Sequence, residues 1–318
     1  MKAGEFKCLV YLKTKHHKLI MKVLVTGGSG LVGSAIKELR PDWIYVGSTE
    51  FGSLAREENV VQMYESVGQV DAVIHLAANV GGLLKNMNKR AEMYEDNILM
   101  NTHVLSHAVK HKVPRVLNML STCIFPDGLK ELRPSDLHTG PPHKSNEGYA
   151  YAKRVCEVHS RIVRETTDTW TTCIIPTNIY GPNDNFSIEN GHVVPALIHK
   201  AWLAKKNNEP LKLFGTGKAK RQFIHSRDIA RIIVWAVELT ENPPPEIVCA
   251  HGDEVSIGEV AQLIADATGC PGIEYIEGPD GQMNKKSIPG PGDFPVPSVS
   301  LEDGIRETVE WFDRVKMA

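Results

Sequence analysis

The chain has 318 residues, and its 36 Lys and Arg residues are balanced by 38 Asp and Glu residues, so the formal net charge is −2. Hydrophobic residues make up 42% and charged residues 23% of the chain, which excludes a disordered, collagen-like or low-complexity protein. The near-zero charge argues against nucleic acid as a partner, because phosphate binding needs an excess or a face of basic residues. No apolar run approaches the roughly 20 residues that a membrane-spanning helix needs, so we expect no membrane partner.

The six cysteines stand at positions 8, 123, 156, 173, 249 and 270. No two of them form a CxxC pair, so neither a zinc site nor a thioredoxin-type motif is indicated. Their spacing is not typical of a secreted disulfide framework, and we expect a reducing, cytoplasmic location. His103, His107 and His111 recur every fourth residue, but no acid or cysteine completes a metal site there, so we predict no metal cofactor.

Residues 1–21 are expected to form an N-terminal extension outside the fold. The apolar stretch at 8–12 is too short for a signal-peptide core, and basic residues interrupt the sequence after it. A β-branched run begins directly after Met21, and we expect the fold to start there.

Strands alternate with helices over the next 160 residues or so. Apolar and β-branched runs predict five strands, at 22–26, 43–46, 72–76, 116–120 and 172–176. Helical stretches are predicted at 34–39, 90–111 and 149–166. This alternation indicates parallel βαβ units. We therefore predict an α/β fold, with a Rossmann-type doubly wound parallel sheet over residues 22–180.

The pattern of the sequence changes after Gly181: the expected loops are longer, and Pro and Gly are more frequent. Short strands predicted at 211–214, 247–249 and 273–276 mix with helices at 192–205, 228–239, 257–267 and 301–315. We predict a smaller α/β C-terminal lobe over residues 181–318 that binds the substrate. Part of 220–250 is expected to return to the first domain.

A glycine-rich turn follows the first predicted strand and opens a helix. Its GxxGxxG spacing allows a tight turn, close approach to a pyrophosphate and close helix–strand packing. The helix start adds free N–H groups and a positive dipole end. Alone, such a triplet is equally compatible with a turn that binds nothing, but the strand–turn–helix context favours a dinucleotide. The candidate cofactor-binding residues are Gly27, Gly28, Ser29, Gly30, Leu31, Val32 and Gly33.

The end of the second predicted strand bears on the choice of dinucleotide. An acidic residue at this place holds the ribose 2′-OH of NAD. Gly47 and Ser48 stand there instead, so a 2′-phosphate is not repelled at that point, although no arginine is adjacent. These residues weakly favour NADP(H) over NAD(H).

Tyr149 and Lys153 form a YxxxK pair on a predicted helix, where spacing i, i+4 puts both side chains on one face. Reduction of a carbonyl needs a proton donor, and a nearby ammonium lowers the pKa of a phenol and stabilises its phenolate. Lys153 can also hydrogen-bond the nicotinamide ribose, so it is a candidate cofactor-binding residue as well. Tyr151 has no such lysine, because position 155 is Val.

Ser121 ends the fourth predicted strand, where ligands lie in open α/β sheets, and can donate a hydrogen bond to a substrate oxygen or cap a turn.

Several longer segments together resemble the GDP-L-fucose synthases, a family within the extended short-chain dehydrogenases/reductases. They are residues 77–82 (AANVGG), 120–126 (LSTCIFP), 146–153 (NEGYAYAK), 176–186 (PTNIYGPNDNF), 191–195 (GHVVP) and 215–223 (GTGKAKRQF). The resemblance runs from about Met21 to the C-terminus. It implies NADPH-dependent conversion of GDP-4-keto-6-deoxy-D-mannose to GDP-L-fucose, by epimerisation at C3 and C5 and reduction at C4.

The resemblance also assigns roles to individual residues. Cys123 becomes the base and His192 the acid of the epimerisations, while Ser121 and Tyr149 steady the charge that builds on O4. Tyr149 then protonates O4 with support from Lys153. Without the resemblance, Cys123 is better interpreted as a small buried hydrophobe and His192 as an ordinary residue at a helix start.

The resemblance also implies further binding residues, at positions of this chain that match the family's motifs. For the cofactor they are Pro176, Thr177, Asn178, Ile179 and His192, and for the GDP-sugar Lys200, Phe214, Arg221 and Asp280. Phe214 stands where animal members have Trp, and Asn183 replaces a common His. The resemblance finally implies a homodimer that packs through the helices near 90–112 and 149–166.

Three alternatives stay open. A 4,6-dehydratase would have an Asp-Glu pair where Cys123 and Ile124 stand, and a 4-epimerase needs no acid–base pair of the Cys/His type. A non-catalytic NADP-binding sensor usually loses the YxxxK pair, which this chain keeps.

Overall fold

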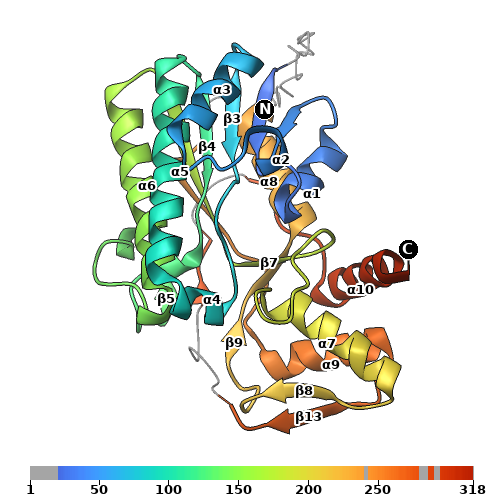
Figure 1. Ribbon diagram of the computed structural model, residues 1–318. Helices are drawn as coiled ribbons and strands as arrows, with labels where there is room; N and C mark the ends of the chain where they lie inside the picture. Colours follow the sequence, from blue (N-terminus) through green and yellow to red (C-terminus); the bar gives the residue numbers. More distant parts are fainter. Residues whose placement is uncertain (1–20, 240–242, 279–285, 290–293, 318) are drawn as a thin grey trace, which may run out of the picture.

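The structure is a computed structural model that describes residues 21–239, 243–278, 286–289 and 294–317. The expected N-terminal extension lies outside the described residues, apart from Met21. Two lobes are stacked one above the other in Figure 1, an upper lobe built on a large sheet and a lower one built mainly of helices.

All six strands of the large sheet run parallel, in the order β11-β6-β4-β3-β1-β2. They are β1 (Val23–Thr26), β2 (Ile44–Val46), β3 (Ala72–His75), β4 (Arg115–Met119), β6 (Trp170–Pro176) and β11 (Glu246–Cys249). Every residue of β1 and β3 is buried, as expected for a parallel sheet that is covered on both faces. The five strands predicted in the first half of the chain are confirmed, with ends that differ by two residues at most.

Helices cover both faces of this sheet (Figure 1). On one face lie α3 (Glu57–Val67), α5 (Arg90–Lys110) and α6 (Glu147–Thr166), and on the other α1 (Leu31–Leu39) and α8 (Ser226–Val234). Because strand side chains alternate between faces, Val23 and Val25 pack with Ile36 of α1, whereas Leu24 packs with Leu105 of α5. The doubly wound α/β fold class is confirmed.

Some helices differ from those predicted. Three were missed: α2 (Ser48–Phe51), α3 and α4 (Leu83–Asn88). Helix α1 begins at Leu31, three residues earlier than expected, because the glycine-rich turn runs directly into it. The helix expected at 228–239 is α8 followed by a π-helical turn, η4 (Trp235–Leu239).

The lower lobe packs three helices against a two-stranded parallel sheet. They are α7 (Val193–Asn207), α9 (Ile257–Thr268) and α10 (Leu301–Met317), with β8 (Leu211–Phe214) and β13 (Ile273–Ile276). Its core contains Leu197, Ile264 and Phe312, one from each helix. The helices and strands predicted for these segments are confirmed to within two residues.

Three further strand pairs occur among the described residues. The first two join residues before 181 to residues after it, and the third lies within residues 181–318. They are β7 (Asn178–Tyr180) with β10 (Phe223–His225), β5 (Glu131–Leu132) with β14 (Lys286–Ser287), and β9 (Lys220–Arg221) with β12 (Val255–Ser256). Three 3₁₀ turns lie in the same region: η1 (Thr122–Ile124), η2 (Pro134–Asp136) and η3 (Lys144–Asn146). The buried amide of Gln222 donates to the Gly252 carbonyl and accepts from the Ser287 N–H. These links fix the lower lobe beneath the carboxyl edge of the large sheet.

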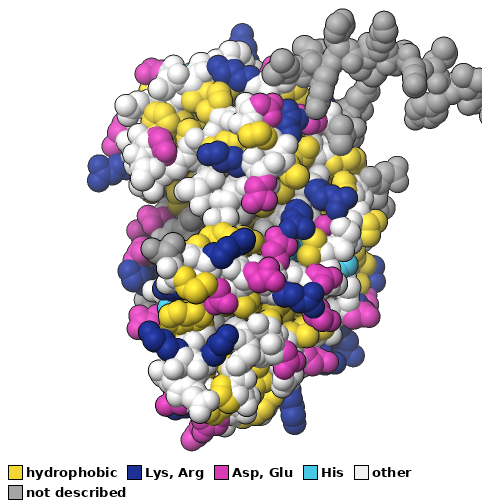
Figure 2. All heavy atoms as spheres, turned by 90° about the vertical axis from the view of Figure 1, so that its right-hand side faces the viewer, with side chains coloured by type: hydrophobic (Ala, Val, Ile, Leu, Met, Phe, Trp, Pro, Cys, Tyr) yellow, Lys and Arg dark blue, Asp and Glu magenta, His cyan; other side chains and the backbone are white. Residues whose placement is uncertain are grey.

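Acidic and basic side chains are interspersed on the face shown in Figure 2, which therefore offers no basic stripe for nucleic acid. Among the described residues, none of the helices has the length and apolar character needed to cross a membrane. Within the same ranges no cluster of three or more His, Cys, Asp or Glu could hold a metal ion.

Candidate active site

A cavity of about 1120 Å³ runs between the lobes, from the glycine-rich turn to the lower lobe. It lies at the carboxyl ends of the parallel strands, where ligands of open α/β sheets bind. Most of the candidate residues line it: Gly27, Ser29, Gly30, Leu31, Val32, Gly33, Ser121, Cys123, Tyr149, Pro176, Thr177, Asn178, Ile179, His192, Lys200, Phe214 and Arg221. Gly28 and Lys153 lie behind this lining, and Asp280 falls outside the described residues.

The glycine-rich turn has the shape that a dinucleotide requires. Gly27 has a φ of +71°, a conformation that favours glycine, and a Cβ at Gly33 would come within 2.5 Å of the Gly27 carbonyl oxygen. A Cβ at Gly30 would meet only that same oxygen, at 3.4 Å, so the backbone there is open to the cavity. No side chain caps α1 at Gly30, which leaves its first N–H groups for a phosphate.

Gly28 has a structural role that differs from that of the neighbouring glycines. Its N–H donates to the Val46 carbonyl, and a Cβ there would come within 2.7 Å of the Tyr45 Cβ. Gly28 therefore holds the turn close against β2 and does not face the cavity.

Tyr149 and Lys153 lie on the side of α6 that faces the cavity. The Lys153 Nζ is 5.9 Å from the centroid of the Tyr149 ring, and the lysine side chain is almost fully buried. Burial lowers the pKa of Lys153, because the ammonium is removed from water. Burial, with nearby Cys123, raises the pKa of Tyr149, so the phenol keeps its proton until charge develops beside it.

A buried chain of polar groups, which the sequence analysis missed, lies behind this pair. Asn101 Oδ1 accepts from Lys153 Nζ at 3.5 Å and from His75 Nε2 at 3.2 Å. His75 Nδ1 lies 2.8 Å from the Thr26 hydroxyl, which also accepts from the Ala77 N–H. Because Asn101 presents its oxygen to Nε2, the His75 proton lies on that nitrogen and Thr26 donates to Nδ1.

His75 is held neutral at the centre of this chain. It is fully buried, and burial, with the nearby charge of Lys153, lowers its pKa to about 3. A neutral imidazole can fix the Asn101 amide without adding a second positive charge beside Lys153. Lys153 is thereby positioned from β1 and β3, on the far side from the cavity.

Ser121 and Cys123 stand at the turn that follows β4. The Ser121 Oγ accepts from the Cys123 N–H at 3.3 Å, which places both residues at the start of η1. The Arg154 guanidinium holds this turn through the carbonyls of Ile124 and Gly140. Cys123 is partly buried: it packs against the hydrophobic cluster around Leu120 and Ile124 and also lines the cavity.

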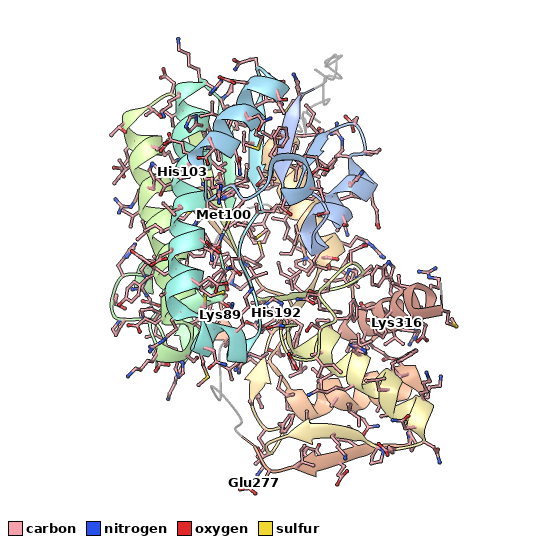
Figure 3. All side chains as sticks on the ribbon, in the orientation of Figure 1. Lys89, Met100, His103, His192, Glu277 and Lys316 are labelled. Atoms are coloured by element: carbon pink, nitrogen blue, oxygen red, sulfur yellow. The ribbon has the colours of Figure 1, made fainter. Side chains whose placement is uncertain are left out.

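His192 stands at the N-terminal end of α7, between the two lobes in Figure 3. The loop before it folds back on itself: the Gly191 N–H donates to the Ser187 carbonyl, and Asn183 takes a left-handed φ of 65°. This fold brings Asp184 into the same part of the cavity wall as His192.

Asp184 is a second residue that the sequence analysis missed. Its Oδ1 accepts from the Asn185 N–H at 2.7 Å, while its Oδ2 is buried with no hydrogen-bond partner among the described residues. Burial raises the pKa of this carboxyl, and His192 opposes that rise. In the sequence, the only signal for Asp184 was its place in the GPNDNF run, next to Asn183.

The lower lobe contributes two cations to the cavity. Lys200 on α7 places its Nζ 4.8 Å from the centroid of the Phe214 ring, and Arg221 lies on β9. Burial lowers the pKa of both side chains, since each is partly removed from water. Paired cations in a partly dry wall are suited to a diphosphate.

Comparison with known proteins agrees with this arrangement. The model of the NAD dependent epimerase/dehydratase family matches residues 23–250. GDP-L-fucose synthase of Dictyostelium discoideum is 42% identical over 306 residues, which cover 91% of this chain and 94% of that protein. The Escherichia coli (strain K12) GDP-L-fucose synthase is 31% identical over 314 residues, or 92% of this chain and 96% of that protein.

A solved structure is similar over nearly the whole chain. The GDP-L-fucose synthetase from Naegleria fowleri bound to NADP has a TM-score of 0.81 and 36% identity, and the match covers 94% of each chain. The resemblance found in the sequence is thus confirmed by an independent comparison. The chain belongs to the NAD dependent epimerase/dehydratase family and, within it, to the GDP-L-fucose synthases.

Proposed function

We propose that this chain is an NADPH-dependent epimerase and reductase that converts GDP-4-keto-6-deoxy-D-mannose to GDP-L-fucose. One observation carries the proposal beyond the family likeness: a single cavity is lined by the glycine-rich turn, Tyr149, Cys123 and His192. A plain reductase needs only the first two of these features. The thiol and the imidazole give the same cavity a base and an acid.

Epimerisation uses the groups of the cavity wall around the sugar. The 4-keto group acidifies the hydrogens on C3 and C5, so a base can remove one while negative charge moves to O4. Cys123 acts as this base, and His192 returns a proton from the other face of the ring, which inverts the carbon. Ser121 and Tyr149 donate hydrogen bonds to O4 as its charge builds.

Reduction at C4 uses the α6 pair. Bound NADPH supplies the hydride that reduces C4, and the fit of the glycine-rich turn described above supports its binding there. Tyr149 gives its proton to O4, which turns the keto oxygen into a hydroxyl. Lys153, held in place by Asn101, stabilises the phenolate that remains. Pro176, Thr177, Asn178 and Ile179 form the adjoining wall against the nicotinamide.

The nucleotide half of the substrate is assigned to the lower lobe, residues 181–318. Lys200 and Arg221 stabilise the diphosphate, and Phe214 offers an apolar ring beside Lys200. Asp280 remains a candidate for the same substrate. A dehydratase is less well supported, because Cys123 and Ile124 stand where its Asp-Glu pair would be.

An activity measurement tests the proposal directly. Purified protein with GDP-4-keto-6-deoxy-D-mannose should oxidise NADPH, and mass spectrometry with a sugar standard should identify GDP-L-fucose. Oxidation of NADPH without inversion at C3 and C5 would indicate a plain 4-reductase. No oxidation with any keto-sugar nucleotide would contradict an enzymatic function and favour a cofactor-binding sensor.

We also propose a homodimer through α5 and α6, which lie side by side on the outer face of the upper lobe (Figure 1). These helices expose large apolar side chains: Tyr94, Leu99, Val155 and Ile162 are 38–47% exposed. Light scattering should give twice the chain mass of 35.2 kDa, and a monomer mass would contradict the proposal. Cys156, Cys173, Cys249 and Cys270 form no disulfide, which suits the proposed reducing, cytoplasmic location.

A further inference from the structure

A loop of the upper lobe contacts the chain immediately before His192. The loop follows β3, and its tip, residues 81–82, leads into α4. The Gly82 N–H donates to the Asn190 carbonyl at 3.0 Å, so the contact lies two residues before His192. It therefore falls at the junction of the two lobes, where Figure 3 labels His192.

The two backbones approach too closely for side chains. A Cβ on Gly82 would come within 2.5 Å of the Gly191 carbonyl oxygen, and a Cβ on Gly191 within 2.5 Å of the Ser187 carbonyl oxygen. Gly82 has a φ of −66°, which any residue adopts, so the close approach and not the backbone conformation excludes a side chain there. A methyl group on Gly82 would push on the chain that leads to His192.

Asn86 of α4 fixes the tip of this loop. Its Nδ2 donates to the carbonyls of Gly81 at 2.8 Å and Gly82 at 3.1 Å, and its side chain is buried at the cavity wall. The Gly81 carbonyl and the Gly82 N–H belong to one planar peptide unit. The amide that holds the carbonyl therefore also sets the direction in which the Gly82 N–H points.

The start of the loop is anchored in the interior of the upper lobe. The fully buried side chain of Asn97, on α5, accepts from the Asn79 N–H at 3.0 Å and donates to the Asn79 carbonyl at 2.9 Å. The Lys85 Nζ donates to the Asn79 side chain at 2.6 Å and to the Val80 carbonyl at 3.0 Å. Hydrogen bonds therefore run from α5 through this loop to the chain before His192.

The position of His192 depends on this support. Its side chain is exposed and makes no capping hydrogen bond to α7, so its place follows from where the preceding backbone is held. We propose that Asn86 is a positioning residue for the acid of the epimerisations, acting through the Gly82 N–H on the chain before His192. The inference rests on the proposed function, which assigns that acid to His192. Because a displacement of about 1 Å at a reacting group can cost about 100-fold in rate, partial loosening of this support should cost about tenfold.

Two variants test the inference by different routes. Asn86→Leu removes the side-chain amide at similar volume, whereas Gly82→Ala keeps Asn86 and pushes on the Gly191 carbonyl. In both we expect deuterium entry at C3 and C5 to slow by about tenfold, while NADPH oxidation with a substrate already inverted at both carbons stays within about twofold. A residue that only stabilised the fold would lower both rates together.

A matched control and a second measurement complete the experiment. Asn88→Leu changes an exposed residue of the same helix that does not line this cavity, and it should leave both rates near those of the wild type. Amide hydrogen exchange is measured without substrate. Peptides covering residues 183–192 should exchange about tenfold faster in Asn86→Leu and Gly82→Ala than in the wild type, whereas peptides of α9 should be unchanged.

The outcomes separate the inference from the proposed function. Equal losses of both rates in the two variants, or no loss in either, would overturn the positioning role of Asn86. So would unchanged amide exchange of residues 183–192 in both. A wild type that showed neither deuterium entry nor NADPH oxidation would instead contradict the proposed function, while amide exchange would still test the contact between the two loops.

Discussion

The two walls of the cavity hold their reactive groups in different ways. On the wall formed by the large sheet, Lys153 is tied to His75 and Asn101 by hydrogen bonds among almost fully buried groups. On the wall formed by residues 181–192, His192 is exposed and Asp184 keeps a buried oxygen without a partner among the described residues. The groups proposed for reduction are therefore fixed in a dry interior, whereas the acid proposed for the epimerisations, His192, is open to solvent.

The difference between the two walls corresponds to a difference between the two proposed reactions. Protonation of O4 must coincide with reduction at C4, so the donor needs one fixed position. Epimerisation exchanges protons with the medium, and a histidine in contact with water can lose and regain its proton quickly. The comparison predicts that reduction and epimerisation can be damaged separately, by substitutions of Tyr149 on one hand and of Cys123 or the residues near His192 on the other.

Substitution of Tyr149 tests the separation most strongly. Tyr149→Phe removes the proton donor, and we expect NADPH oxidation to fall by about 10³-fold. Solvent deuterium should still enter C3 and C5, because Cys123 and His192 remain, although more slowly since one donor to O4 is lost. Absorbance of the reduced nicotinamide follows the first process and mass spectrometry the second.

Tyr151 provides the control for this experiment. It lies on the same helix, does not line the cavity, and packs under the Arg154 guanidinium. Tyr151→Phe should leave both rates near those of the wild type. Equal losses of NADPH oxidation and deuterium exchange in Tyr149→Phe would mean that reduction and epimerisation cannot be damaged separately.

Substitution of Cys123 should give the opposite result. Cys123→Ser replaces a thiol by a far less acidic hydroxyl, and we expect deuterium entry at C3 and C5 to fall by about 100-fold. A substrate already inverted at both carbons should still be reduced. Cys270→Ser, at a partly buried thiol of the lower lobe, is the control. Full exchange in Cys123→Ser would remove this residue as the base.

The buried chain behind Lys153 makes stability depend on pH. The pKa of His75 is about 3 in the folded protein, below its ordinary value of about 6.5, so only the unfolded chain takes up this proton between those values. The free energy of unfolding therefore falls as the pH falls from about 6.5 towards 3, by about 2 kcal/mol at pH 5 from this residue.

His75→Gln isolates this contribution. The variant lacks the titrating group, so the stability gap between wild type and variant should narrow by about 2 kcal/mol between pH 7.5 and pH 5 in urea unfolding experiments. His103→Gln, at a half-buried histidine of α5 that contacts the Leu54 carbonyl and not this buried chain, is the control. A gap that stays constant with pH would show that His75 is not held neutral.

The sequence was sufficient for the regular parts of the fold and insufficient where distant residues meet. The strands could be predicted because each is a short apolar run between helices. Helix α3 was missed because it buries only Val60, Met63 and Tyr64 among eleven mostly polar residues. Its apolar spacing is helical, but the stripe is narrow.

The buried chain illustrates a different limit. Thr26 and His75 lie 49 residues apart, yet they are register partners at the ends of β1 and β3. Two polar residues ending adjacent strands were a usable signal, whereas Asn101 enters from α5 and depends on how that helix packs.

Substitution of Asp184 has the smallest predicted effect, and it tests most directly the cavity wall formed by residues 181–192. Its carboxylate has an oxygen without a hydrogen-bond partner among the described residues, and it interacts electrostatically with His192, the acid proposed above. We expect Asp184→Asn to slow deuterium entry at C3 and C5 by about tenfold, because the negative charge beside the proposed acid is lost. Glu189→Gln removes an exposed charge from the same loop and should have little effect. Reduction of a substrate that is already inverted should be unchanged in Asp184→Asn; an equal loss there would assign Asp184 to the shape of the whole cavity rather than to His192.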